Sequence, residues 1–263
     1  MMRAEDVLAV LELLERAAVE VWLDGGWGVD ALLCEQTRPH EDLDLVVRAE
    51  SLEHCGRALR DHGFRLSGQD GPYPPARVDD AGRRIDVRAL ELDVTRTHER
   101  DAASLTGSGR VRGRRVDCRT AESQIAAHTG YPIGADDERD VLALHHRFGV
   151  PLAGRVRTWH EAAGWGVLDA DNLRDDVWAH FSAVEGDGRV EPSAGQTVLF
   201  SVEDAPDEDP SVEGAARGGC RRRALTVRPA SPVSPALARH VHGAERPAPY
   251  GRYGVVRGGP SPD

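Results

Sequence analysis

The sequence predicts an α+β domain, in which helices flank a mixed sheet, followed by a smaller all-β unit of five strands. Two observations support this prediction. In residues 1–150 of the 263, segments with apolar residues at helical spacing interleave with short strand-like runs. From residue 155 onward, short strands alternate with frequent turns, which is typical of a small barrel or sandwich. The run Gly149-Val150-Pro151 separates the two parts.

Helices are predicted in the first domain where apolar residues recur every three or four positions. In the first of these segments, Val7, Leu11 and Leu14 share one side, and acidic residues occupy the other. Helices are expected at 4–18, 27–35, 51–62, 120–129 and 137–148. Strands are expected at 19–23, at 42–47, and as a pair across 76–90 that turns at Asp80-Ala81-Gly82.

The second unit has a different texture. Its five short strands are expected at 155–160, 164–169, 177–181, 197–202 and 222–227. An acidic, glycine-rich insertion at 203–219 separates the last two. The end of the chain is dense in Pro, Gly, Ser and Ala and has little periodicity, which predicts disorder. The expected organisation is therefore a first domain at 1–150, a barrel at 155–229 and a disordered tail at 230–263.

The composition excludes several chemistries. All 33 basic residues are arginines, and the formal net charge is −11. Without lysine the chain cannot form a GxxxxGK(S/T) phosphate loop or a Schiff base, so phosphate binding must use arginine, backbone amides or a metal ion. Four cysteines without a CxxC pair predict neither a zinc site nor a disulfide framework. No leader and no apolar run of about 18 residues is visible, so we expect a soluble, cytoplasmic protein without a membrane partner.

Two carboxylates on one predicted strand are the sharpest chemical signal. Asp42 and Asp44 are two residues apart, which places their side chains on the same face with Cα atoms about 6.6 Å apart. Carboxylates so placed repel each other unless a cation lies between them. A magnesium ion, which binds a few carboxylates together with substrate phosphates, would remove that repulsion. Alternatively, such a pair is simply the solvated face of a sheet.

The residues around this pair are suited to bind phosphates. Gly25-Gly26 ends a predicted strand and begins a helix, so the backbone there can approach a triphosphate. Arg38 and His40 precede the carboxylate strand and are expected to neutralise outer phosphate oxygens. Asp86, on a neighbouring predicted strand, is the expected third carboxylate, with Asp79 as the alternative. Its role would be to complete the metal site or to accept a proton.

The order of these features resembles a known enzyme family. The runs Trp22–Asp30 and Gln36–Leu45 look like those of the lincosamide and aminoglycoside-2''-adenylyltransferase group, within the polymerase-β-type nucleotidyltransferases. The resemblance covers about residues 1–148. It implies that Asp42 and Asp44 are metal ligands, that Asp86 is the third carboxylate and that Gly25-Gly26 belongs to the nucleotide site.

The resemblance also implies a reaction. A hydroxyl of a small acceptor, such as a lincosamide or an aminoglycoside antibiotic, would attack the α-phosphate of ATP or another nucleoside triphosphate, and pyrophosphate would leave. Two magnesium ions would assist. The acceptor pocket is expected beside the sheet, near Glu91, His128, Tyr131 and the helix at 136–148. His145 and His146 on that helix are expected to be surface or packing residues rather than metal ligands.

Residues 155–229 resemble a cold-shock domain, which implies a five-stranded OB-like barrel. The matching runs are Gly164–Leu168, Val177–Val184, Gly195–Val202 and Ala224–Pro229. The aromatic face that would stack on single-stranded bases is formed by Trp165, Trp178, His180 and Phe181. Three residues depart from the family pattern. Thr158 stands where a stacking tryptophan is expected, Val167 replaces a phenylalanine, and Ala163 replaces the basic residue before the glycine.

The charge of the barrel argues against nucleic acid. Residues 155–229 contain nine arginines and fourteen acidic residues, whereas phosphate neutralisation supplies most non-specific affinity. We therefore expect weak or no nucleic-acid binding unless the Arg221–Arg223 cluster lies beside the aromatic face. Two other readings remain: nucleotidyl transfer to RNA or protein with the barrel presenting the polymer, or a non-enzymatic single-strand binder. The preferred reading is an adenylyltransferase that acts on a small hydroxylated acceptor.

Overall fold

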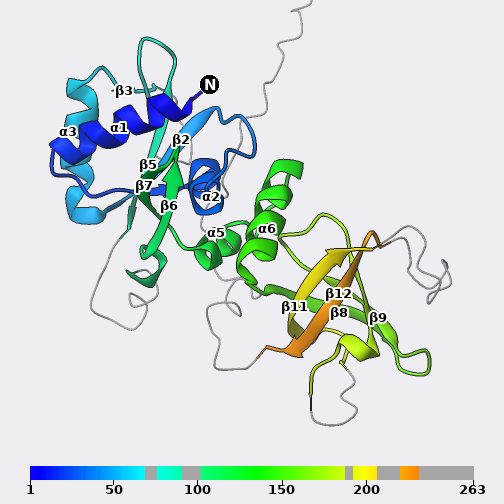
Figure 1. Ribbon diagram of the computed structural model, residues 1–263. Coiled ribbons are helices and arrows are strands. Elements are labelled where there is room, and N and C mark those ends of the chain that lie inside the picture. Colours follow the sequence, from blue (N-terminus) through cyan, green and yellow to red (C-terminus); the bar gives the residue numbers. More distant parts are fainter. Residues whose placement is uncertain (69–75, 91–101, 187–191, 206–219, 231–263) are drawn as a thin grey trace, which may run out of the picture.

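The computed structural model describes residues 1–68, 76–90, 102–186, 192–205 and 220–230 (Figure 1). They form a mixed sheet with helices, followed by a closed five-stranded barrel, which confirms the predicted fold class. The predicted disordered tail and most of the acidic insertion fall outside the described residues, as does Glu91. No helix among the described residues is long and apolar enough to cross a membrane.

The first sheet has seven strands in the order β3-β4-β5-β2-β1-β7-β6. Its centre is formed by β2, which pairs in parallel with β5 and antiparallel with β1. The first four strands are β1 (Trp22–Asp24), β2 (Asp42–Arg48), β3 (Arg65–Leu66) and β4 (Arg77–Val78). The others are β5 (Arg84–Leu90), β6 (Gly107–Val111) and β7 (Arg114–Cys118). The central position of β2 places its two aspartates between neighbouring strands.

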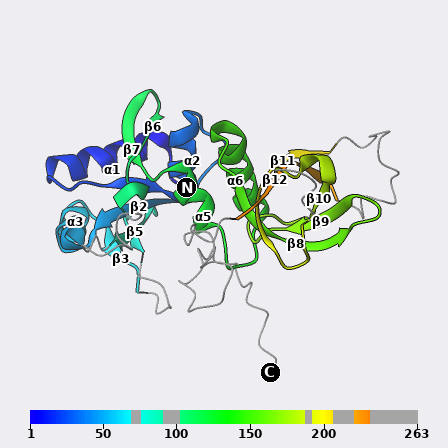
Figure 2. The ribbon, with the colours of Figure 1, turned by 90° about the horizontal axis from the view of Figure 1, so that it is seen from below.

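Helices cover the two faces of this sheet (Figures 1 and 2). Those nearest the sheet are α1 (Ala4–Arg16), α2 (Gly25–Leu33) and α3 (Leu52–Asp61), which follows the 3-10 turn η1 (Ala49–Ser51). The helices α5 (Ala121–Ala127) and α6 (Ala135–Phe148) pack on each other and on α2. As predicted, α1 buries Val7, Leu11 and Leu14. α2 packs so closely on β6 that a Cβ on Gly109 would lie 2.1 Å from the carbonyl oxygen of Ala31.

The β6–β7 hairpin was not predicted from the sequence. Its strands consist mostly of Gly, Ser, Arg and Asp, and Val111 and Val116 are their only β-branched residues, whereas strands favour β-branched and aromatic residues. The turn between them has Arg112 at φ 49° and Gly113 at φ 81°. Two positive φ values are typical of a type I′ turn, for which Asn-Gly or Asp-Gly is the usual signal and Arg-Gly is not.

The barrel closes in the strand order β10-β12-β11-β8-β9. Its strands are β8 (Leu152–His160), β9 (Trp165–Asp169), β10 (Val177–His180), β11 (Thr197–Asp204) and β12 (Arg222–Pro229), with the turn η2 (Phe181–Ala183) after β10. All five predicted strands are present, although β8 begins three residues earlier than expected. Leu152, Leu168 and Phe200 are fully buried in the barrel. The helix α6 lies between the sheet and the barrel (Figures 1 and 2).

Candidate active site

Three neighbouring strands bring three carboxylates into register. Asp44 on β2 pairs with Asp86 on β5 and with Asp24 on β1. Asp42 lies two residues before Asp44 and therefore projects from the same face. Sequence reasoning identified Asp42, Asp44 and Asp86 but missed Asp24, which is the last residue of its strand and is 1 % exposed. Its position immediately before Gly25-Gly26, at the end of a buried run, was the available signal.

The electrostatics of these carboxylates favour a bound cation. Burial raises the pKa of Asp44 well above its usual value, and the charges of Asp42, Asp24 and Asp86 raise it further. The pKa of Asp42 is raised by burial and by Asp86. Such shifts mean that the ionised carboxylates repel one another. A positive charge placed among them is therefore stabilised.

Arginines supply part of that positive charge. Arg84 donates to Asp86 Oδ2 through Nε at 3.1 Å and Nη2 at 2.9 Å, and its Nε lies 4.0 Å from Asp42 Oδ2. Arg88 and Arg119 lie 3.5 and 3.4 Å from Asp24 Oδ2. Sequence reasoning assigned no role to these arginines. Their proximity depends on strand register, which a single sequence does not reveal.

The two glycines that begin α2 touch the site. Gly25 has φ +55°, and a Cβ there would lie 2.2 Å from Asp44 Oδ2. A Cβ on Gly26 would lie 2.3 Å from His40 Nδ1 and 3.0 Å from Arg38 Nη2. Any side chain at either position would collide with these groups. The glycines thus bring the first turn of α2 against both the carboxylates and the Arg38–His40 segment.

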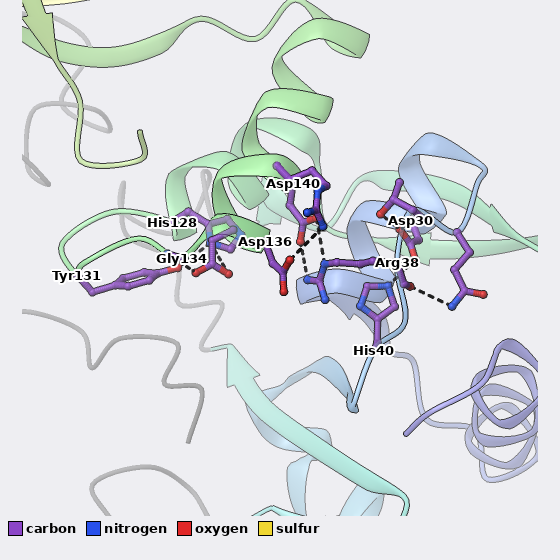
Figure 3. Close-up of polar contacts among 12 residues, drawn as sticks. Asp30, Arg38, His40, His128, Tyr131, Gly134, Asp136 and Asp140 are labelled. Atoms are coloured by element: carbon purple, nitrogen blue, oxygen red, sulfur yellow. Dashed lines mark hydrogen bonds and ion pairs between the residues drawn. The ribbon is translucent and has the colours of Figure 1, made fainter. Parts of the chain in front are cut away.

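Arg38 and His40 are held by carboxylates of the protein itself (Figure 3). Arg38 Nη2 donates to Asp140 Oδ2 of α6 at 2.7 Å. Burial lowers the pKa of this guanidinium, but the contact with Asp140 outweighs burial, so the pKa is raised above its ordinary value. His40 is 3 % exposed, and its Nε2 lies 2.5 Å from Asp30 Oδ2. The structure thus places both residues beside Gly26, and their contact with phosphate oxygens stays a prediction.

The donor set of the carboxylate cluster suits magnesium. Aspartate oxygens on one face are the ligands that Mg²⁺ prefers. Among the described residues, however, no three carboxylate, imidazole or thiol side chains converge as a metal site. Asp86 faces Arg84 instead. The carboxylates fit the chemistry of a metal site, and Arg84 occupies part of the space between them. Asp79, the alternative to Asp86, is bound to Arg83 and lies in the turn before β5.

A second group of polar residues lies beside Arg38 (Figure 3). His128 Nδ1 lies 2.7 Å from the hydroxyl of Tyr131 and 4.0 Å from Asp137 Oδ1. Burial lowers the pKa of His128. These residues, expected at the acceptor pocket, thus share the α5–α6 side of the sheet with the Arg38–Asp140 pair.

The predicted aromatic face of the barrel is assembled on β9, β10 and η2. His180 pairs with Trp165 across β9 and β10. Its ring stacks on that of Trp178, with 5.7 Å between the ring centroids, and its centroid lies 4.4 Å from that of Phe181. Phe181 is 57 % exposed, whereas Trp178 is 6 % exposed. Arg223 pairs with Trp178 in register, but its side chain binds Glu203 at 2.5 Å. Part of the arginine cluster therefore lies beside this face and is already neutralised.

Comparisons with known proteins find relatives of two kinds. A family model described as aminoglycoside-2''-adenylyltransferase matches residues 6–144. The lincosamide resistance protein of Staphylococcus haemolyticus is 26 % identical over 155 residues, which cover 53 % of this chain and 92 % of that protein. The cold shock-like protein CspE of Bacillus anthracis is 40 % identical over 53 residues, or 20 % of this chain and 78 % of that protein.

Two solved structures are similar to about half of this chain. The lincosamide antibiotic adenylyltransferase LnuA, bound to lincomycin, is 23 % identical with a TM-score of 0.47 and covers 54 % of this chain and 96 % of its own. ANT(2'')-Ia in complex with adenylyl-2''-tobramycin is 18 % identical with a TM-score of 0.48 and covers 56 % of this chain and 89 % of its own. On the family match, the chain belongs to the aminoglycoside-2''-adenylyltransferase family of antibiotic-modifying enzymes, and it carries a cold-shock-like region that forms the five-stranded barrel.

Proposed function

We propose that this adenylyltransferase transfers AMP from ATP to a hydroxyl of a small cationic antibiotic, a lincosamide or an aminoglycoside, with the help of magnesium. The observation that carries the proposal is the row of in-register carboxylates on β1, β2 and β5, directly beside the glycines that begin α2. Family membership implies ATP as the nucleotide. The metal and the acceptor are our proposals.

Asp42 and Asp44 would hold the magnesium, because their charges repel each other on one face of β2. When bound, the metal lowers the pKa of an attacking hydroxyl and neutralises phosphate charge. Asp86 is 27 % exposed at its side chain and lies opposite Asp44, which suits it to accept the proton of the acceptor hydroxyl or to complete the ligand set. The hydroxyl attacks the α-phosphate in line, and pyrophosphate leaves.

The triphosphate would lie along the first turn of α2. Gly25 and Gly26 leave room for it, and the backbone N–H groups at a helix N-terminus favour anions. Arg38 beside Gly26 would contact an outer phosphate through the guanidinium edge that Asp140 does not occupy. His40 would support the backbone there from its buried pair with Asp30.

The acceptor would lie on the α5–α6 side, near His128 and Tyr131. The N-terminal turn of α6 carries Asp136 and Asp137, which favours a cationic ligand. Of the similar structures, LnuA is bound to lincomycin and ANT(2'')-Ia is in complex with adenylyl-2''-tobramycin.

The test is pyrophosphate release from ATP with a panel of lincosamides and aminoglycosides in the presence of Mg²⁺. We expect release with at least one acceptor, and a loss of at least 1,000-fold in Asp42→Asn and in Asp44→Asn. Asp117→Asn, an exposed carboxylate on β7, is the matched control and should retain full activity. Release that survives both Asp42→Asn and Asp44→Asn would show that the active site lies elsewhere.

A further inference from the structure

Opposite faces of α6 contact the barrel and the nucleotide side of the first domain. Glu138 and His145 are seven residues apart, which is nearly two full turns, so they share one face of the helix. Asp140 is two residues from Glu138 and lies about 200° around the helix. Val141 and Leu144 are fully buried between these faces. The helix is therefore built into both parts of the protein.

The C-terminal end of α6 is bound to the backbone of β11. His145 is 3 % exposed, and its Nδ1–H donates to the carbonyl of Val150 at 2.6 Å while its Nε2 accepts from the N–H of Val202 at 3.1 Å. His146 Nε2 lies 3.2 Å from the carbonyl of Val202. The β8–β11 pairing ends at Leu152 and Phe200. The two imidazoles thus bind the edge of β11 where its strand partner stops.

The N-terminal end of α6 is bound to β12 and to the loop before β10. Glu138 Oε1 accepts from Arg222 Nη1 at 2.9 Å and from the backbone N–H of Arg174 at 2.7 Å. The side chains of Glu138 and Arg222 are 10 % and 11 % exposed. Moving one partner of this ion pair away would leave the other charge buried without its counter-charge, which is costly. The pair therefore fixes the position of α6 relative to β12.

The opposite face of α6 holds the phosphate-side arginine. Asp140 is 2 % exposed and accepts from Arg38 Nη2 at 2.7 Å and from Nε at 3.4 Å (Figure 3). The same Nη2 lies 3.0 Å from where a Cβ of Gly26 would be. A continuous series of contacts therefore joins the barrel to the first turn of α2 through Glu138, α6, Asp140 and Arg38.

We propose that the barrel acts as a brace for the nucleotide site, and that Glu138 and His145 are positioning residues that fix α6 so that Asp140 holds Arg38 against Gly26. The proposal assigns the cold-shock-like barrel a role within adenylyl transfer. It rests on the proposed function, because the effect is expected on ATP. Loosening α6 would leave Arg38 free to sample positions away from the triphosphate, which weakens nucleotide binding more than it slows the bond-forming step.

The experiment measures nucleotide affinity and local backbone protection in the full-length chain. Glu138→Ala and His145→Ala are titrated with a non-hydrolysable ATP analogue, and hydrogen exchange is followed at the amide of Thr37, which donates to Asp30 Oδ1 at 3.0 Å next to Arg38. We expect the Kd of the analogue to rise at least fivefold, kcat to change less than twofold, and exchange at Thr37 to quicken at least tenfold. Glu138→Gln, which keeps the size of the side chain, replaces Glu138→Ala if that variant does not fold.

Leu168→Val is the matched control. It trims the barrel core on β9, away from α6, and should lower thermal stability without changing nucleotide affinity or Thr37 exchange. Unchanged affinity and exchange in the α6 variants, or equal changes in Leu168→Val, would overturn the brace. If the wild-type chain does not bind the analogue, the proposed function fails, and Thr37 exchange alone then decides whether the barrel braces α6.

Discussion

Asp44 lies directly opposite Asp86 across the parallel strands β2 and β5. Asp44 is also opposite Asp24 on its other side, so the central strand of the sheet carries a carboxylate flanked by two others. Folding therefore brings together like charges whose repulsion destabilises the folded state. The arrangement is explained if a ligand of opposite charge is bound there during catalysis.

Replacing Asp44 should separate activity from stability. Asp44→Asn removes a charge that burial and three neighbouring carboxylates disfavour, so the metal-free protein should gain about 1 kcal/mol, or 2–4 °C in Tm. Adenylyl transfer should be lost. Thermal unfolding in EDTA, with Asp117→Asn as the reference, is the measurement. A clear fall in Tm would mean that Asp44 stabilises the fold instead.

Arg84 should compete with the metal. It donates to Asp86 and lies 4.0 Å from Asp42, although its side chain is 31 % exposed, so its loss should cost about 1 kcal/mol or less without metal. In Arg84→Met the carboxylates lack this counter-charge, and Mg²⁺ should raise Tm more than in the wild type because it binds the folded state more tightly. Arg57→Met, which breaks an exposed pair with Glu53, should leave the Mg²⁺ effect unchanged. Equal Mg²⁺ shifts in Arg84→Met and the wild type would contradict the competition.

The features that could be predicted from the sequence are those that depend only on residues close together in the chain. The alternation at Asp42-Leu43-Asp44-Leu45 predicts a strand with two carboxylates on one face, and Gly25-Gly26 predicts the close approach that the structure shows. Asp24, Arg84 and Arg88 were missed because their contacts depend on which strands pair and in what register. No local pattern records register between distant strands.

The contacts of α6 were hidden for a different reason. His145 was expected to be a surface or packing residue, and it is buried, but both of its ring nitrogens bind backbone groups. Backbone partners carry no side-chain signature, so nothing in the sequence around Val202 indicates them. Similarly, Arg38 was predicted from its position before β2, whereas its partner Asp140 lies 102 residues away.

Gly26 should not tolerate a side chain. In Gly26→Ala the new Cβ would lie 2.3 Å from His40 Nδ1, so His40 or α2 must move, at a cost of about 1–3 kcal/mol. Because the displaced groups face the proposed nucleotide site, the KM for ATP should rise as well. Gly68→Ala is the control, since a Cβ at Gly68 meets nothing within 4 Å. Unaltered KM and Tm in Gly26→Ala would refute the close approach.

Acidification should loosen the barrel from α6. Burial lowers the pKa of His145 below the ordinary 6.5, so the unfolded chain binds this proton more readily than the folded one. The stability contributed by neutral His145 is thus complete above pH 6.5 and is lost as pH falls towards the lowered pKa. Between pH 7.5 and 5, the free energy of unfolding should fall less steeply with decreasing pH in His145→Gln than in the wild type. His128, whose pKa is also lowered by burial, keeps part of the slope in both. Identical slopes would exclude a role for His145.

The barrel should bind single-stranded nucleic acid poorly. Phe181 is exposed and could stack on a base, but Arg223 is paired with Glu203 and Arg222 with Glu138, so these two guanidinium groups are already neutralised. Since phosphate neutralisation supplies non-specific affinity, the Kd for a labelled oligonucleotide at physiological salt should be weaker than about 10⁻⁴ M. Glu203→Gln removes the negative charge that Arg223 pairs with and should strengthen binding, with a steeper dependence on salt. Micromolar binding by the wild type that is lost in Phe181→Ala would contradict this and favour a polymer acceptor presented by the barrel.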